Sequence, residues 1–250
     1  MDRSVIAMLC RISDRDQGTV QGAAALGRVL EARTIGSPGT AATRGWEEDL
    51  RTGRGCLLEA GGQVDDALEA GRVPVLLSGD CSVCVSTLPV VARRHPDAMV
   101  LWIDAHGDFN TPDTTASQFL GGMCLAGACG LWDTGFGGDL EPARVVMTGV
   151  RDLDGPEQVL LETNGVGRVD RPGALADLLD ARKVFVHLDL DVLDPEVLPA
   201  AFPAPGGLQL EQLKRLLTLV CEASDLVGAE VTNARPELVD ELADVLAPLL

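Results

Sequence analysis

The chain has 250 residues, 46% of them apolar, which is enough for one domain with a large buried core. Its formal net charge of −18 would repel a phosphate backbone, and an aromatic content of only 3% with no tyrosine argues against stacking on bases. No apolar run is long enough to span a bilayer, so we expect neither a nucleic acid nor a membrane as a partner.

Apolar, β-branched runs alternate with helical patterns along the chain. Strands are predicted at 5–10, 73–77, 99–105, 145–150, 184–190 and 226–231. Helices are predicted at 19–32, 48–69, 84–94, 174–180, 210–223 and 237–249. Strands separated by helices indicate βαβ units. We therefore expect a single α/β domain over residues 1–250, with three layers: a mostly parallel central sheet and helices on both of its faces.

Two of these strands end in runs of carboxylate and imidazole side chains. Asp104, His106 and Asp108 close the run around residues 99–103, and Asp189 and Asp191 close the run around 184–186. Alternate residues of a strand point the same way, so each set is expected to share one face. Together they could hold two divalent cations, a pair that makes water nucleophilic at neutral pH.

Three irregular stretches, at 107–122, 132–142 and 195–207, are rich in Gly, Pro, Thr and Asp. They follow strand ends or lie between elements. Ligands of parallel sheets bind beyond the carboxyl ends of the strands. All three stretches are therefore predicted to roof the site.

The seven cysteines are an odd and scattered set, which indicates free thiols in a reducing compartment and no disulfide framework. The first residues lack the charged start, apolar core and cleavage site of a signal peptide. We expect a cytoplasmic location. Cys81 and Cys84 have the spacing of a redox pair, which is the less favoured interpretation of that segment.

The segment Ser78-Gly79-Asp80-Cys81-Ser82 precedes the two acidic motifs, and the three motifs in this order resemble those of the arginase, agmatinase and formiminoglutamase (ureohydrolase) family. The resemblance extends from about residue 18 to residue 230. It implies an arginase-like fold and manganese-dependent hydrolysis of a guanidino C–N bond, in which metal-activated water attacks the guanidine carbon.

The resemblance also implies roles for individual residues. Asp104 and Asp189 would bridge two Mn²⁺ ions, Asp108 would bind the first ion and take part in catalysis, and His106 and Asp191 would bind the second. Glu230 would hold the guanidinium group during catalysis. Asn110, Thr115 and Ser117 would grip the substrate α-carboxylate and Asp154 its α-amino group. A guanidino amino acid is therefore favoured over a guanidino amine.

Three positions depart from the family pattern. Cys81 stands where the family has a metal-binding His, which weakens or alters the first manganese site because a thiolate is a softer ligand. Gly121 stands where a proton-shuttle His is expected. His187 replaces the usual Ser, and we interpret it as a buried residue that supports the ligands more readily than as a ligand itself.

A branch of the family that shares changes at the first motif hydrolyses Nω-hydroxy-L-arginine. The resemblance therefore implies hydrolysis of this compound to L-ornithine and hydroxyurea, of L-arginine to L-ornithine and urea, or of both. Two alternatives remain: a catalytically impaired relative that binds a guanidino compound or a partner, and a hydrolase of a formimino amino acid. The oligomeric state is open, since family members often form homo-oligomers.

Overall fold

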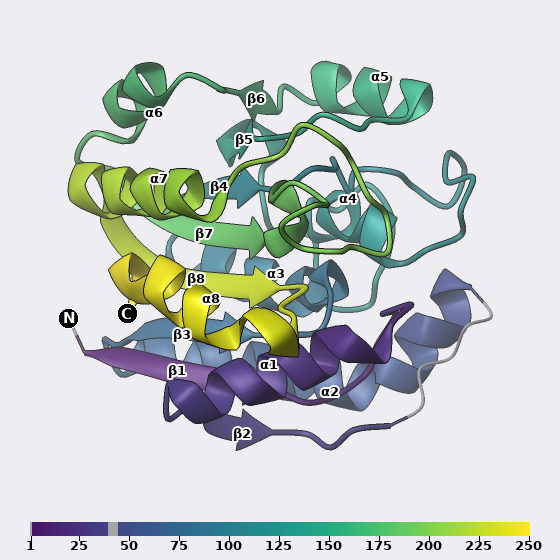
Figure 1. Ribbon diagram of the computed structural model, residues 1–250. Helices are drawn as coiled ribbons and strands as arrows, with labels where there is room; N and C mark the ends of the chain where they lie inside the picture. The colour runs from purple at the N-terminus through teal and green to yellow at the C-terminus, as the bar shows by residue number, and fades with distance from the viewer. Residues whose placement is uncertain (1, 40–44) are drawn as a thin grey trace.

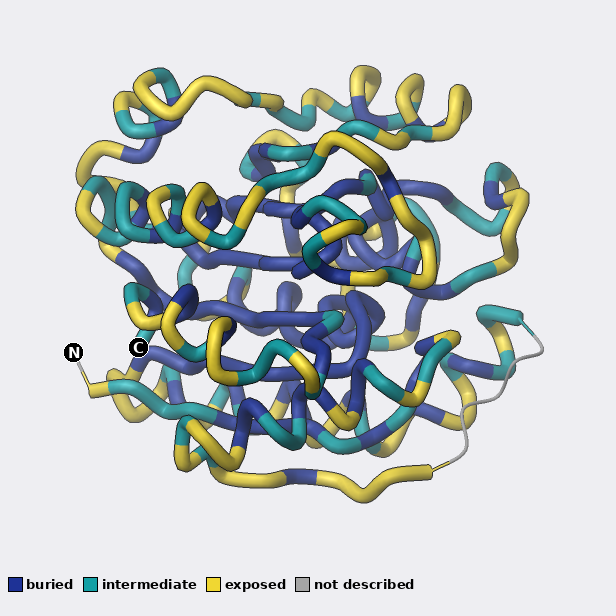
Figure 2. The backbone as a smooth tube through the Cα atoms, in the orientation of Figure 1, coloured by how far each residue is buried: buried dark blue, intermediate teal, exposed yellow. Residues whose placement is uncertain are grey.

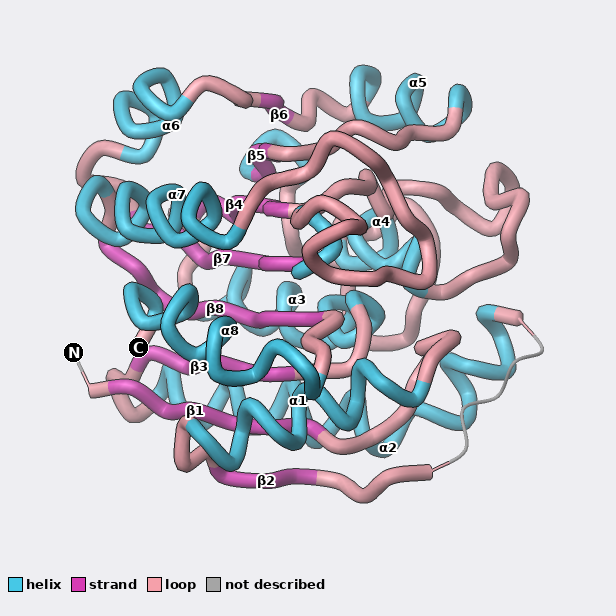
Figure 3. Tube along the Cα trace, viewed as in Figure 1, coloured by secondary structure: helices cyan, strands magenta, loops and turns pink. Residues whose placement is uncertain are grey.

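Eight parallel strands form one sheet in the computed structural model, which describes residues 2–39 and 45–250 (Figure 1). The strand order is β2-β1-β3-β8-β7-β4-β5-β6, and every pairing is parallel. The strands are β1 (Arg3–Met8), β2 (Arg33–Ile35), β3 (Val73–Leu77), β4 (Met99–Ile103), β5 (Val145–Thr148), β6 (Gly167–Arg168), β7 (Lys183–Asp189) and β8 (Asp225–Thr232). Their carboxyl ends lie along one edge, where loops gather (Figure 3).

Helices cover both faces of the sheet. One face packs against α2 (Trp46–Glu69), α3 (Cys84–Arg94), α4 (Cys124–Ala128) and α5 (Gly155–Thr163), and the other against α1 (Gln17–Val29), α6 (Pro172–Leu179), α7 (Leu210–Ala223) and α8 (Val239–Leu246). The central strands between these layers are buried along almost their whole length (Figure 2). None of the described helices is long and apolar enough to cross a membrane.

The predicted three-layer α/β architecture is confirmed, and all six predicted strands and six predicted helices are present; β3, α3 and α7 have the predicted bounds, and the others have shifted ends. The prediction missed β2, β6, α4 and α5. The first three are only 3, 2 and 5 residues long, too short for a periodic pattern. Helix α5 begins with a capping box in which Asp154 and Glu157 each satisfy the other's backbone N–H, a signal that the prediction overlooked.

Asp189 is the last residue of β7, as predicted, but the other four metal-ligand candidates do not continue their strands. Strand β4 ends at Ile103, so Asp104, His106 and Asp108 lie in the turn that follows it. Asp104 Oδ1 accepts a hydrogen bond from the His106 backbone N–H, and Asp189 Oδ1 accepts one from that of Asp191, each over 2.7 Å. These carboxylate-capped turns, and not strand alternation, bring the side chains together.

Two of the three irregular stretches contribute to the roof of the site, since residues of 107–122 and 195–207 line the cavity described below. The stretch 132–142 was wrongly placed there. It packs against helices on the outside of the sheet, where Arg54 donates a hydrogen bond to the Gly135 carbonyl and Arg93 pairs with Asp139.

The prediction that all cysteines are free thiols is wrong for one pair. Cys10, just after β1, forms a disulfide with Cys56 on α2, with the two Cα atoms 6.3 Å apart. The other five, including Cys81 and Cys84, are free. The thiol count therefore no longer supports a reducing compartment, and the cytoplasmic location stays a prediction.

Candidate metal centre and active-site cavity

A cavity of about 210 Å³ opens at the carboxyl edge of the sheet. Loops that follow β1, β3, β4, β5, β7 and β8 all contribute to its wall. The wall is strongly acidic, with nine carboxylate side chains: Asp14, Asp16, Asp80, Asp108, Asp152, Asp154, Glu157, Asp189 and Asp191. Such a wall favours cations, either metal ions or the cationic end of a substrate.

The first candidate ligand group joins Asp104, His106 and Asp191, whose donor atoms all lie within 4.8 Å of one another. His106 Nδ1 is 3.1 Å from Asp191 Oδ2 and 3.4 Å from Asp104 Oδ1. Burial, together with the neighbouring carboxylates Asp191, Asp189 and Asp108, raises the pKa of Asp104 well above its usual range. Burial lowers the pKa of His106, but its hydrogen bonds to Asp104 and Asp191 outweigh that effect and raise it to about 12. Two oxygen donors and one imidazole suit a Mn²⁺ ion.

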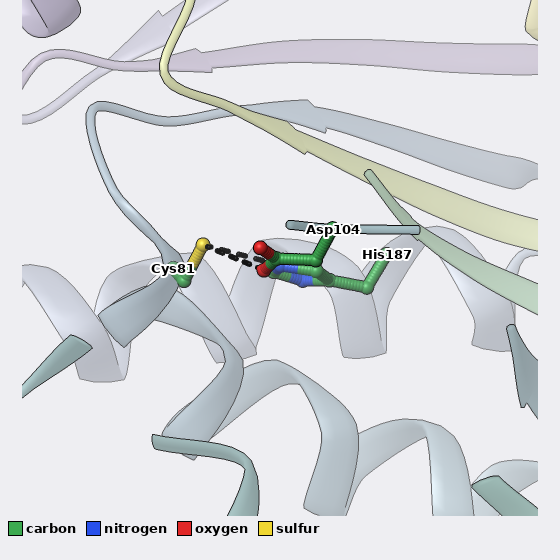
Figure 4. Close-up of side chains that lie close together, drawn as sticks. All are labelled: Cys81, Asp104 and His187. Atoms are coloured by element: carbon green, nitrogen blue, oxygen red, sulfur yellow. Dashed lines mark hydrogen bonds between the residues drawn. The ribbon is translucent and has the colours of Figure 1, made fainter. Parts of the chain in front are cut away.

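The second candidate group joins Cys81, Asp104 and His187, again within 4.8 Å (Figure 4). Cys81 Sγ lies 3.3 Å from His187 Nε2 and 3.9 Å from Asp104 Oδ2. Asp189 accepts a hydrogen bond from the Cys81 thiol over 2.7 Å. Burial, followed by the charges of Asp189, Asp108 and Asp104, raises the pKa of that thiol well above its usual range.

Asp104 belongs to both groups, and Asp189 contacts the second group and the turn of the first. This placement fits the bridging roles that the resemblance implies for the two carboxylates. Asp108 lies in the same cavity but outside both groups, and its Oδ2 accepts a hydrogen bond from Cys124 over 3.7 Å. Burial is also the main reason why the pKa of Asp108 is raised well above its usual range.

Glu230 is not at the cavity, which corrects the expectation that it faces the substrate. It is fully buried, with Oε1 2.7 Å from His187 Nδ1 and Oε2 accepting a hydrogen bond from Thr87 over 2.5 Å. The imidazole of His187 stands between Glu230 and the ligand cluster. The family pattern has Ser at position 187, and that side chain is too short to stand between Glu230 and the ligand cluster. The histidine at this position therefore accounts for the absence of Glu230 from the cavity wall.

Three of the four residues predicted to bind the amino-acid end of the substrate line the cavity. Asn110, Ser117 and Asp154 line it, and Asn110 Nδ2 donates a hydrogen bond to Asp154 Oδ2 over 3.4 Å. Thr115 does not line the cavity but orders the loop, because its hydroxyl accepts a hydrogen bond from the backbone N–H of Gln118.

Sequence analysis missed an aromatic and cationic group at the mouth of the cavity. The Phe119 and Phe202 rings are 5.0 Å apart between centroids, and the Arg15 guanidinium lies 4.9 Å from the Phe119 centroid. Within the described part of the chain, no ion pair of Arg15 is found. The position of Arg15, shortly after the first predicted strand, was the available signal.

Phe119 also explains the glycine at position 121. A Cβ on Gly121 would lie 2.5 Å from Phe119 Cε1 and 2.7 Å from Cζ, which is well inside van der Waals contact. The ring thus occupies the space that a side chain at position 121 would enter.

Comparisons with known proteins agree with this geometry. The model of the Arginase family matches residues 48–247. An N(omega)-hydroxy-L-arginine amidinohydrolase of Streptomyces lavendulae is 39% identical over 94% of this chain and 89% of its own length. The arginase of Bacillus caldovelox is 34% identical over 71% of this chain and 66% of its own length.

The fold itself matches solved structures over its full extent. The structure of the Bacillus caldovelox arginase superposes with a TM-score of 0.82, at 25% identity, covering 99% of this chain and 96% of that one. An Entamoeba histolytica arginase superposes with a TM-score of 0.86 at 19% identity, over 99% and 97% of the two chains.

Proposed function

Because the chain belongs to the arginase family, we propose that it is an amidinohydrolase that cleaves the guanidino C–N bond of an arginine-like amino acid, with Nω-hydroxy-L-arginine as the favoured substrate. The products would be L-ornithine and hydroxyurea. The observation that carries the proposal is one cavity that contains both the carboxylate and imidazole ligands and the Asn110, Ser117 and Asp154 subsite.

The acidic wall suits a substrate whose side chain ends in a guanidine or hydroxyguanidine. Asp154 would receive the α-amino group, and Asn110 and Ser117 would hold the α-carboxylate. Arg15 adds a cation at the mouth, where a carboxylate is the partner that a guanidinium prefers. A guanidino amine without a carboxylate makes none of these last contacts.

Asp104, His106 and Asp191 would hold Mn²⁺, with Asp189 beside them. When bound, such an ion lowers the pKa of water and polarises the group under attack. Asp108 would accept the proton of the attacking water at a carboxylate oxygen and pass it to the nitrogen of the departing amine.

The substrate preference rests on position 121. No imidazole is present there to deliver a proton to the leaving amine, and Phe119 fills the space. A hydroxyguanidine is less basic than a guanidine, so it more readily presents a neutral, electrophilic form. The name of the Streptomyces lavendulae relative points to the same substrate.

A catalytically impaired protein that binds a guanidino compound is the second candidate. It is favoured by the Cys81 thiol, whose pKa is raised by burial and by the carboxylates around it, in a position where the family has an imidazole. A formimino amino acid as substrate has no comparable support, because the likeness to a Bacillus subtilis formimidoylglutamase is at 16% identity and concerns the fold alone.

Steady-state kinetics with Mn²⁺ present test the proposal on Nω-hydroxy-L-arginine, L-arginine and agmatine, with ornithine, hydroxyurea and urea measured as products. We expect the highest kcat/KM for Nω-hydroxy-L-arginine and almost no turnover of agmatine. Asp191→Asn serves as an inactive control and Asp113→Asn, on an exposed part of the substrate loop, as an active one. Equal, background-level rates in the native protein and Asp191→Asn would contradict the proposed hydrolysis and favour the catalytically impaired protein that only binds a guanidino compound.

A further inference from the structure

We propose that Cys81 and His187, together with Asp104, form a thiolate–imidazole site for a thiophilic cation such as Zn²⁺, in which Glu230 orients the imidazole. The proposal concerns which ion this half of the metal centre takes. It does not depend on which guanidino compound the protein hydrolyses.

The donor atoms lie at the separation that one cation requires. In a tetrahedral zinc site, metal–sulfur and metal–nitrogen bonds of their usual lengths place sulfur and nitrogen about 3.5 Å apart. Cys81 Sγ and His187 Nε2 are 3.3 Å apart, and Asp104 Oδ2 lies 3.9 Å from the same sulfur. The thiol, the imidazole and the Asp104 carboxylate therefore converge on one point, and Asp189 accepts a hydrogen bond from the thiol beside it over 2.7 Å.

The orientation of the imidazole is fixed from behind. His187 Nδ1 lies 2.7 Å from Glu230 Oε1, which fits the tautomer that donates its Nδ1–H to this carboxylate oxygen. Nε2 is then left with its lone pair directed toward Cys81. A carboxylate that accepts the second N–H of a ligating histidine is the usual support of such a ligand.

The sheet itself builds this support. Trp102, His187 and Glu230 are direct neighbours on β4, β7 and β8. The Trp102 and His187 rings stack with their centroids 3.5 Å apart and their planes within 2°. Thr87 holds the other oxygen of Glu230. All of these side chains are buried, so the imidazole has no freedom to turn away from Cys81.

The two halves of the metal centre therefore differ in chemistry. The group of Asp104, His106 and Asp191 offers oxygen and nitrogen, which suit Mn²⁺, whereas the group around Cys81 and His187 adds a thiolate, which selects softer ions. Zinc binds most nitrogen and oxygen sites more tightly than manganese does. A preference for zinc over manganese would therefore not be sufficient evidence. The test must detect a metal–sulfur bond and its loss in variants that lack the thiol.

The test uses the metal ions without any substrate. The metal-free full-length protein is titrated with Co²⁺ as a spectroscopic substitute for zinc, and Zn²⁺ affinity is measured by competition with a chelator. We expect a thiolate-to-cobalt charge-transfer band in the native protein. The band should vanish in Cys81→Ser and persist in the matched control Cys84→Ser, whose buried thiol belongs to neither ligand group.

Zinc affinity should fall about tenfold or more in Cys81→Ser and His187→Gln, and by a similar factor in Glu230→Gln through loss of the orienting bond. Circular dichroism checks that each variant is folded. If the cobalt-loaded native protein lacks a charge-transfer band, the proposal is overturned even where buried variants fail to fold. Unchanged zinc affinity in folded Cys81→Ser overturns it as well. Failure of guanidine hydrolysis would leave these readouts unaffected.

Discussion

Replacing Gly121 with alanine places a methyl group against the ring of Phe119. The φ of Gly121 is not positive, so the backbone itself accepts a side chain, and only the ring opposes it. Phe119 is partly exposed and can turn outward, but it then loses its contacts with Phe202 and Arg15. Those contacts together are worth about 1–2 kcal/mol. We expect Gly121→Ala to be destabilised by about that amount, equivalent to a melting temperature lower by about 2–8 °C.

The assay is a double-mutant cycle by thermal and denaturant unfolding, with Gly121→Ala, Phe119→Ala and the double variant. The cost of the methyl group should disappear when Phe119 is absent, giving a coupling energy of at least about 0.5 kcal/mol. An equal cost in both backgrounds would refute the steric explanation of the glycine.

The same pair of positions tests the substrate preference. Gly121→His in the Phe119→Ala background has room for an imidazole. It should raise the ratio of kcat/KM for L-arginine to that for Nω-hydroxy-L-arginine by about tenfold, which corresponds to about 1.4 kcal/mol. An unchanged ratio in a folded, metal-loaded variant would show that the missing imidazole does not set the preference.

Four further outcomes are expected. Asp104→Ala and Asp189→Ala should each abolish turnover, and near-native rates with intact metal content would contradict their bridging roles. Cys81→His should bind Mn²⁺ more tightly in calorimetric titration, because imidazole suits this ion better than a thiol; equal affinities would refute that. Arg15→Gln should raise KM for amino-acid substrates about tenfold while leaving the low activity on agmatine unchanged, if the guanidinium binds the carboxylate. Burial raises the pKa of Asp49 to about 7, and neither of its oxygens has a hydrogen-bond partner among the residues that the structure describes. A raised carboxyl pKa means that the folded state keeps its proton longer, so this group should lower the free energy of unfolding by on the order of 1–3 kcal/mol as the pH rises from 4 through 7. In urea titrations, Asp49→Asn should show a fall that is smaller by that amount.

The central architecture was predictable because buried parallel strands are apolar at successive positions. β3, β4 and β7 show such runs, and their burial on both faces is the cause. The edge strands β2 and β6 were not predictable, since they are 3 and 2 residues long and half or more exposed. The disulfide between Cys10 and Cys56 joins positions 46 residues apart, and cysteine spacing alone gives no such pairing.

The ligands at the strand ends were predictable for a similar reason, because Asp104 and Asp189 follow apolar runs at the edge where parallel strands open. The mouth of the cavity was not. Arg15, Phe119 and Phe202 come from three loops far apart in the sequence, and their contacts depend on the strand order, which a single sequence does not reveal.

Glu230 shows most clearly what sheet register adds to a motif. The resemblance assigns a substrate-binding role to Glu230 from its position on β8 alone. Its hydrogen bonding, however, depends on His187, its direct neighbour on β7. Once an imidazole occupies position 187, it lies between Glu230 and the cluster and directs its free nitrogen at Cys81. The departures at positions 81 and 187 thus meet at one point, 3.3 Å apart, although 106 residues separate them in the chain. Under the proposed zinc site they act as a single change, in which the imidazole absent from the loop after β3 is supplied instead by β7, two strands away in the sheet.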